Sequence, residues 1–258
     1  LFLLDMDGTL YLGDKLIEGA KDFISFLDSG GIGYVFLTNN SSKGAQEYIK
    51  RMRDFGFPCT SRNVYTSGMA TAEFLNKNYK GQRVYLMGTE ALKREFEDYN
   101  IILTEQDPEI VVVGFDMELS YSKIEKACSF LQSGAKFIAT HPDTVCPIDK
   151  YRSIPDCGSM CAMITAATGR IPEFIGKPKR TMIDQMSIKW NVPNESIAMV
   201  GDRLYTDIAA GISAEATSIC VLSGETNEED IASSKWKPDY VFPSVKELLE
   251  ELKAGLGE

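Results

Sequence analysis

The chain has 258 residues, 44% of them hydrophobic and 25% charged, as expected for a folded protein with one large or two modest domains. Its 27 basic and 37 acidic residues give a formal net charge of −10, which argues against nucleic acid or a membrane surface as a partner because their phosphates are also negative. The sequence contains no apolar run long enough to cross a bilayer and no signal-peptide pattern. Its six cysteines are scattered without a C-x-x-C pair, so we expect reduced thiols in a cytoplasmic protein.

Short apolar runs alternate with amphipathic stretches along the whole chain. The first predicted elements are strand 1–4, helix 18–28, strand 34–37, helix 44–55 and helix 69–78. A second set follows, with strand 83–87, strand 110–113, helix 122–132, strand 136–139, helix 158–168 and a connection at 169–176. The last elements are helix 181–190, strand 197–200, helix 205–212, strands 218–222 and 239–242, and helix 245–252. This alternation predicts the α/β class, with a parallel sheet covered by helices on both faces.

Polar residues that could carry chemistry follow the predicted strands, and ligands of parallel sheets gather at these strand ends. Asp5 and Asp7 come directly after the first strand, and Gly8 allows the chain to turn sharply. Two carboxylates in close proximity repel each other unless a cation or a shared proton relieves the repulsion. The alternative interpretation is an ordinary solvated Asp-Gly turn.

Later strand ends carry groups that could bind phosphate or a metal ion. Thr38 and Asn39 offer a hydroxyl, an amide and backbone N–H groups, although such residues also commonly cap helices. Lys177 could neutralise a phosphoryl group, although a lone surface lysine is the commoner case. Asp202 and Asp207 offer hard oxygen ligands that suit Mg²⁺, and a helix N-cap is the alternative.

Taken together and in this order, these residues resemble the haloacid dehalogenase (HAD) superfamily of phosphohydrolases. The family pattern is D-x-D-G after the first strand, Ser or Thr after the second, a distal Lys, and a G-D-x-x-x-x-D segment. The matching residues in this chain are Asp5, Asp7 and Gly8, then Thr38, Lys177, and Gly201 with Asp202 and Asp207. The resemblance implies a Rossmann-like parallel-sheet core. It also implies a Mg²⁺-dependent phosphatase for small phosphate monoesters of the nucleotide, sugar phosphate or p-nitrophenyl phosphate type.

The resemblance further implies a role for each motif residue. Asp5 would be the nucleophile that forms an aspartyl phosphate, and Asp7 the general acid and base. A carboxylate oxygen of Asp5, the backbone carbonyl of Asp7 and the Asp202 carboxylate would hold Mg²⁺, and Asp207 would orient these ligands. The phosphate oxygens would be bound by Thr38, the backbone N–H of Asn39, and Lys177. The catalytic set is then Asp5, Asp7, Thr38 and Lys177.

The spacing of the motifs indicates where a second domain lies. Thr38 follows Asp5 by 33 residues, which leaves no room for an inserted domain, whereas Lys177 follows Thr38 by 139 residues. The predicted domains are a HAD core at 1–81 and 176–258 and an inserted α/β cap domain at 82–175. This arrangement resembles the NagD-like branch, which includes nitrophenyl, nucleotide and phosphoglycolate phosphatases. Caps of this branch often meet in dimers, so a homodimer through the cap is an open expectation.

Several expectations concern residues outside the core motifs. His141 and Asp143 follow a predicted cap strand and are candidate substrate contacts, with a plain structural role as the alternative. Glu215 stands where relatives carry glycine, so we expect an altered turn after that helix. The expected partner is a small phosphorylated metabolite. Two other functions stay open: a phosphotransferase or phosphomutase that uses the same aspartyl phosphate, and a non-catalytic binding domain with the HAD fold.

Overall fold

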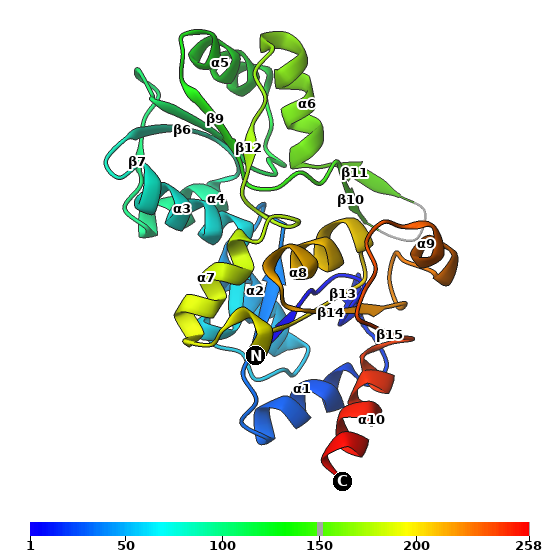
Figure 1. The fold of residues 1–258 in the computed structure, drawn as a ribbon. Helices are drawn as coiled ribbons and strands as arrows, with labels where there is room; N and C mark the ends of the chain where they lie inside the picture. The colour runs from blue at the N-terminus through cyan, green and yellow to red at the C-terminus, as the bar shows by residue number, and fades with distance from the viewer. Residues whose placement is uncertain (149–151, 258) are drawn as a thin grey trace. The chain divides into compact units, whose positions relative to one another are not determined.

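The structure is a computed structural model that describes residues 1–148 and 152–257 (Figure 1). The chain divides into two compact units: the first comprises Leu1–Thr38, Gln46–Tyr65 and Lys177–Glu258, and the second comprises Asn39–Ala45 and Thr66–Gly176. The second unit thus includes 39–45 and 66–81, which the predicted limits assign to the core; core and cap as functional domains remain predictions. None of the helices in the described ranges is both long and apolar enough to span a membrane.

A six-stranded sheet lies at the centre of the first unit, in the order β15-β14-β13-β1-β4-β5. Its strands are β1 (Phe2–Leu4), β4 (Tyr34–Thr38), β5 (Val64–Thr66), β13 (Ala198–Gly201), β14 (Thr217–Val221) and β15 (Tyr240–Phe242). The central strand β1 runs parallel to both neighbours, so that Leu4 lies opposite Val200 on β13 and Phe36 on β4. The residues that follow β1 and β13 therefore emerge at the same edge of the sheet.

Helices and a small hairpin complete the first unit. They are α1 (Ala20–Ser29), α2 (Ala45–Asp54), α7 (Thr181–Trp190), α8 (Ala209–Ala214), α9 (Glu228–Ser233), α10 (Val245–Leu256), the hairpin of β2 (Tyr11–Leu12) and β3 (Lys15–Leu16), and short turns at Ser61–Asn63, Asn194–Ser196 and Leu204–Ile208. The apolar residues of α1 recur at helical spacing and are all buried, namely Ala20, Phe23, Ile24 and Leu27. The helix α1 also packs against α10. Burial of such apolar faces stabilises helices that are too short to form alone.

A five-stranded parallel sheet lies at the centre of the second unit, in the order β12-β9-β8-β6-β7. Its elements are α3 (Ser67–Asn78), β6 (Arg83–Met87), α4 (Glu90–Asp98), β7 (Ile102–Leu103), β8 (Ile110–Val113), α5 (Tyr121–Gln132), β9 (Lys136–Ala139), β10 (Val145–Pro147), β11 (Ser153–Pro155), α6 (Cys157–Thr168) and β12 (Glu173–Phe174). Val111 and Val113 face one side of the sheet, where they cluster with Ala127 of α5 and Ile164 of α6. Every residue of β8 is buried, so both faces of this sheet are covered.

The predicted α/β class with a parallel, Rossmann-like sheet is confirmed. Several elements were not predicted, among them α4, α9, β5, β7 and β12, the last of which lies inside the predicted connection 169–176. These elements are short or strongly charged; α4 has only two large apolar side chains, Leu92 and Phe96, so its helical pattern is weak. The predicted helix 205–212 is a π-helical turn, Leu204–Ile208, that continues as α8.

The turn after α8 is made by a glutamate in an unusual backbone conformation. Glu215 has a φ of 60° and a ψ of 29°, which is the left-handed region that favours glycine at a helix end. The glutamate therefore takes a conformation that a glycine would adopt at lower cost.

Candidate active site

Three carboxylates from the two ends of the chain meet in the first unit. Asp5 directly follows β1, Asp202 directly follows the neighbouring strand β13, and Asp207 lies in the π-helical turn after it. Each offers a carboxylate oxygen, and these oxygens lie within 4.8 Å of one another. Asp202 and Asp207 are buried, and 13% of the Asp5 side chain is exposed. These three residues are referred to below as the acidic cluster.

The ammonium of Lys177 is bonded to two members of the acidic cluster. Its Nζ donates to Oδ1 of Asp5 and to Oδ1 of Asp207, each at 2.6 Å, and also to the carbonyl of Leu37 at 3.4 Å. Only 2% of the lysine side chain is exposed. Burial lowers the pKa of Lys177, but Asp207 and Asp5 raise it more, so the net pKa lies above its ordinary value and the ammonium stays charged.

Negative charge exceeds positive charge within this arrangement. Burial raises the pKa of Asp5 well above its ordinary value, an effect that Lys177 opposes and Asp207 reinforces. Burial, followed by the charge of Asp207, raises the pKa of Asp202 to about 7. One buried ammonium thus bonds to two of the three carboxylates, and a further cation would relieve the repulsion between them.

The two oxygens of the Asp202 carboxylate differ in their hydrogen bonds. Oδ2 accepts a hydrogen bond from the backbone N–H of Glu225 at 2.8 Å, whereas the buried Oδ1 finds no hydrogen-bond partner in the described part of the chain. The Asp202 side chain packs against two glycines that leave room for it. A Cβ on Gly8 would lie 2.3 Å from Asp202 Oδ2, and a Cβ on Gly224 would lie 2.0 Å from the same atom. An unbonded buried carboxylate oxygen close to two other carboxylates is a donor set that suits a hard divalent cation such as Mg²⁺. The residues present therefore fit this ion.

Asp7 and Thr38 have different environments. Asp7 is exposed, and its carboxylate is not part of the acidic cluster. The strand ends before Asp5, and Gly8 turns the chain with a φ of 87°, so the alternation of an extended strand does not pair the two aspartates. The hydroxyl of Tyr11 donates to Oδ2 of Asp7 at 3.4 Å. Thr38 is the last residue of β4 and is buried.

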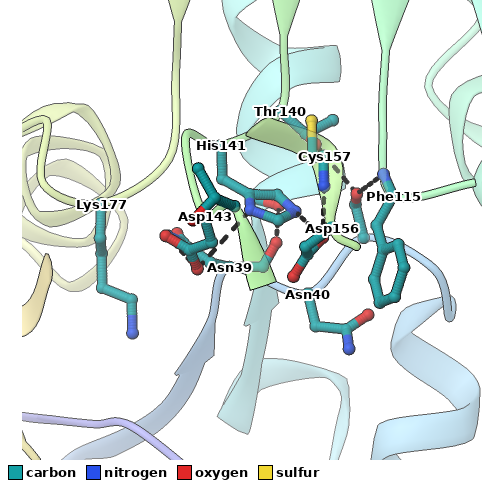
Figure 2. A network of polar contacts seen from close by, with 12 residues as sticks. Asn39, Asn40, Phe115, Thr140, His141, Asp143, Asp156, Cys157 and Lys177 are labelled. Carbon is teal, nitrogen blue, oxygen red and sulfur yellow. Dashed lines mark hydrogen bonds and ion pairs between the residues drawn. The ribbon is translucent and has the colours of Figure 1, made fainter. Parts of the chain in front are cut away.

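A buried polar network in the second unit contains the other predicted residues (Figure 2). Nδ2 of Asn39 donates to both carboxylate oxygens of Asp143, at 3.2 Å each. The fully buried imidazole of His141 lies between two carboxylates, with Nδ1 3.6 Å from Asp143 and Nε2 3.5 Å from Asp156. Burial would lower the pKa of His141, but the negative charge of the Cys157 thiolate and of the two carboxylates raises it to about 9. Contact of His141 and Asp143 with substrate stays a prediction.

Two contributors to the first unit's site escaped the sequence analysis. The loop after β14 supplies the Glu225 N–H and the hydroxyl of Ser223, which donates to the carbonyl of Gly8 at 2.7 Å. Arg203 pairs through Nε with Glu225 at 2.9 Å; burial lowers the pKa of Arg203, but nearby carboxylates, Asp202 first, raise it above its ordinary value. The Ser-Gly-Glu loop follows a predicted strand, so the strand-end rule applied to the other motifs would have found it.

The predicted residues therefore fall into two groups, one in each unit. The geometry brings together Asp5, Lys177, Asp202 and Asp207 in the first unit, and Asn39, His141 and Asp143 in the second. The chemical roles assigned to these residues remain predictions.

Comparisons of the sequence identify the family. Residues 2–102 match the family described as haloacid dehalogenase-like hydrolase, and residues 174–248 match one described as "HAD-hyrolase-like". The chain is 33% identical to an acid sugar phosphatase of Staphylococcus saprophyticus, over 98% of this chain and 97% of that protein. It is also 33% identical to the 5'-nucleotidase YutF of Bacillus subtilis, over 95% of this chain and 96% of that protein.

Solved structures agree. A 4-nitrophenylphosphatase from Thermotoga maritima superimposes with a TM-score of 0.93 at 46% identity, covering 96% of this chain and 95% of that one. NagD from E. coli K-12 superimposes with a TM-score of 0.88 at 35% identity, covering 95% of this chain and 96% of that one. Both the matched residues and the nearly complete coverage show that the chain belongs to the haloacid dehalogenase-like hydrolases, in their NagD-like branch.

Proposed function

We propose that this chain is a Mg²⁺-dependent phosphatase that hydrolyses small phosphate monoesters through an aspartyl phosphate on Asp5. The proposal is carried by the contact of the Asp5 carboxylate with the buried ammonium of Lys177, 2.6 Å away, within a cluster that holds excess negative charge. A carboxylate nucleophile and a phosphate ester repel each other, so their reaction requires fixed positive charge beside both. The phosphatases and the nucleotidase among the relatives support the same reaction.

The proposed metal ligands are those that the family resemblance implies, and the hydrogen bonds of Asp202 and Asp207 support their two roles. Asp5, Asp202 and the backbone carbonyl of Asp7 would hold Mg²⁺, and Oδ1 of Asp202 is available for it. Asp207 accepts hydrogen bonds from Lys177 at 2.6 Å and from the backbone N–H of Arg203 at 3.2 Å, so it would orient its neighbours rather than bind the ion. When bound, Mg²⁺ supplies positive charge that lets an anionic nucleophile approach an anionic substrate.

The first half of the reaction transfers the phosphoryl group to the protein. A carboxylate oxygen of Asp5 attacks phosphorus, a bond forms between them, and the ester bond to the leaving oxygen breaks. Asp7 gives its proton to the departing alkoxide, so the leaving group departs as an alcohol. The exposed position of Asp7, outside the acidic cluster, suits contact with a leaving group that differs among substrates.

The second half returns the protein to its starting state. Water attacks phosphorus, its proton passes to Asp7, and the bond between phosphorus and the Asp5 oxygen breaks. Inorganic phosphate is released, and Asp7 is again the acid for the next cycle. The hydroxyl of Thr38, the backbone N–H of Asn39 and the ammonium of Lys177 bind the phosphoryl oxygens in both halves, where the charge of the transition state is spread.

The substrate class is a small phosphorylated metabolite. The relatives named above are an acid sugar phosphatase, a 5'-nucleotidase and a 4-nitrophenylphosphatase, so sugar phosphates and nucleoside monophosphates are the first compounds to test. The predicted cap, residues 82–175, would select among them by contacting the leaving group. A homodimer through this cap and a cytoplasmic location remain predictions.

The proposal is separated from its alternatives by what the reaction releases. A phosphotransferase or phosphomutase needs an acceptor. Known mutases of the family generally carry a cap between the first two motifs, where Thr38 follows Asp5 by only 33 residues in this chain. A non-catalytic domain would release nothing. Free inorganic phosphate formed in water, without an acceptor and in amounts equal to the alcohol, identifies a phosphatase.

The deciding experiment uses the purified chain with p-nitrophenyl phosphate. We expect turnover with Mg²⁺, loss of turnover with a chelator, and recovery when Mg²⁺ is restored. Asp5→Asn should retain less than about 0.1% of the activity, because an amide is a poor nucleophile. Asp22→Asn is the matched control, since Asp22 is exposed on α1 of the same unit. Substantial turnover by Asp5→Asn would exclude an aspartyl phosphate at this residue.

A further inference from the structure

The segment 39–45 directly follows β4, yet it belongs to the second unit. Its polar groups are bonded to residues at the carboxyl ends of that unit's strands. Ser41 Oγ accepts from the backbone N–H of Phe115, after β8, and lies 2.9 Å from the hydroxyl of Thr140, after β9. Thr89, after β6, donates to the carbonyl of Ser42 at 2.9 Å. Parallel sheets commonly bind ligands at the carboxyl ends of their strands. In the second unit, the segment 39–45 of the same chain occupies this position.

The Asn39 side chain is held from two directions. Its Nδ2 donates to both oxygens of Asp143, which lies 104 positions later in the chain. The backbone carbonyl of Asn39 accepts from the hydroxyl of Ser67. A Cβ at Gly176 would lie 2.6 Å from Oδ1 of Asn39, so the amide is packed against glycine backbone on its other side. Because both sides of the amide are occupied, the side chain has one orientation.

Asp143 is buried together with its counterion. The carboxylate is only 8% exposed, and a buried carboxylate is costly unless a positive charge or several donors compensate it. The imidazole of His141 supplies that compensation from 3.6 Å, and Asp156 faces its other nitrogen (Figure 2). The pKa of His141 is raised to about 9, chiefly by Cys157 and these carboxylates against the effect of burial, so the ring is an imidazolium near neutral pH.

We infer that Asp143 is a positioning residue that fixes Asn39, and through it the backbone N–H that binds the substrate's phosphoryl group. This inference rests on the proposed function, which assigns phosphate binding to Asn39. It differs from the sequence expectation that Asp143 contacts substrate, because both carboxylate oxygens are bonded to Asn39.

The test measures phosphate affinity separately from turnover. The amide oxygen of Asp143→Asn can still accept from Asn39, but the charge and one of the two acceptor oxygens are lost. A hydrogen bond to a charged group is worth about 1 to 1.5 kcal/mol more than a neutral one, so Asp143→Asn should raise KM and the inhibition constant of inorganic phosphate roughly tenfold. We expect kcat to change less than about threefold, because the lost interaction serves substrate and transition state alike. Asp116→Asn is the matched control: Asp116 is also buried at a strand end of the second unit, but it pairs with Lys123 at 2.8 Å. This control should lower stability and leave both constants unchanged.

A double-mutant cycle separates positioning from direct contact. If Asp143 acts through Asn39, then Asp143→Asn should change KM by less than about twofold in a chain that already carries Asn39→Ala. An undiminished effect in that background would overturn the inference and favour contact with substrate. Equal effects of Asp143→Asn and Asp116→Asn on KM would also overturn it, because the loss would then be general.

Hydrogen exchange gives a measurement that does not depend on activity. Asp143→Asn should speed amide exchange in 39–45, whereas Asp116→Asn should not. Unchanged exchange in 39–45 would overturn the inference even in an active enzyme. If the wild-type chain released no phosphate at all, the proposed function would fail, and the exchange comparison would still decide whether Asp143 fixes this segment.

Discussion

The ammonium of Lys177 lies 2.6 Å from a carboxylate oxygen of Asp5, a residue 172 positions earlier in the chain. The same ammonium lies 2.6 Å from Asp207, so one buried cation holds two carboxylates in place. Removal of the cation would leave both carboxylates without compensation, which is more costly than the loss of an exposed ion pair.

Lys177→Met should therefore damage both activity and folding. We expect kcat/KM to fall at least about a hundredfold, because a fixed charge at the reacting group is lost. The free energy of unfolding should fall by roughly 3 to 5 kcal/mol, as for other buried pairs that lose one partner. Steady-state kinetics and urea unfolding check the two effects. Lys179→Met, at an exposed position two residues later, should behave as wild type.

Asp202→Asn should raise the stability of the metal-free protein but weaken its stabilisation by Mg²⁺. The buried Oδ1 lacks a hydrogen-bond partner within the described ranges, and burial with the charge of Asp207 raises the pKa of Asp202 to about 7. Its ionised form therefore destabilises the metal-free fold above that pH, and the neutral amide should raise Tm there. Saturating Mg²⁺ should stabilise wild type by about 3 kcal/mol at a hundred times Kd, and the variant far less. Thermal unfolding with and without Mg²⁺ measures both; an equal response to Mg²⁺ would contradict this assignment.

Gly8→Ala should cost more than Gly13→Ala, although both glycines have positive φ, 87° and 58°. A Cβ at Gly13 meets nothing within 4 Å, whereas one at Gly8 would lie 2.3 Å from Oδ2 of Asp202. Gly13→Ala should thus cost only the strain of the left-handed conformation, about 1 to 2 kcal/mol. Gly8→Ala should cost more and also weaken activation by Mg²⁺, because Asp202 must move. The pair is compared by chemical unfolding and by activity titrated with Mg²⁺.

Glu95→Gln should change how stability depends on pH. Glu95 accepts from the Ala45 N–H at 3.1 Å and from the Thr66 hydroxyl at 3.0 Å. Burial raises its pKa from the ordinary 4.5 to about 7, against the effect of these bonds. Because the folded protein holds this proton more tightly, the stability from Glu95 is full below pH 4.5 and is lost as pH rises through about 7. The loss is at most about 3 kcal/mol.

The matched control for this pH effect is Glu97→Gln, because Glu97 is an exposed neighbour on the same helix. Urea unfolding across the pH range should give a flatter profile for Glu95→Gln than for Glu97→Gln. Identical slopes would show that Glu95 does not titrate in this range.

Glu215→Gly should stabilise the protein. Glu215 holds a φ of 60° at the end of α8, and glycine adopts this conformation without a steric penalty. The gain should be about 1 kcal/mol, which corresponds to roughly 2 to 4 °C in Tm for a chain of this size. Ser213→Gly, inside α8, should do the opposite because glycine weakens a helix interior. A lower Tm for Glu215→Gly would mean that contacts of the glutamate outweigh its backbone strain.

Sequence periodicity was sufficient for the α/β class because it is a local property. Buried strands such as β8 consist of consecutive apolar residues, and helices such as α1 carry apolar residues every three to four positions. Neither pattern depends on the rest of the chain. The placement of Asp5 and Asp202 after strands was equally readable, since parallel strands carry such residues to one edge of a sheet. Charged or very short elements such as α4 and β12 were missed because their patterns are weak.

Tertiary structure alone decided which partner each polar atom has. Packing decides the hydrogen bonds of the two Asp202 oxygens and the exposure of Asp7. It also makes the bond between Asn39 and Asp143, which lie 104 positions apart in the chain. No local pattern encodes such contacts, because they arise only when separate elements meet. For the same reason the sequence could not show that 39–45 is held by the second unit, although Thr38 and Asn39 are neighbours in the chain.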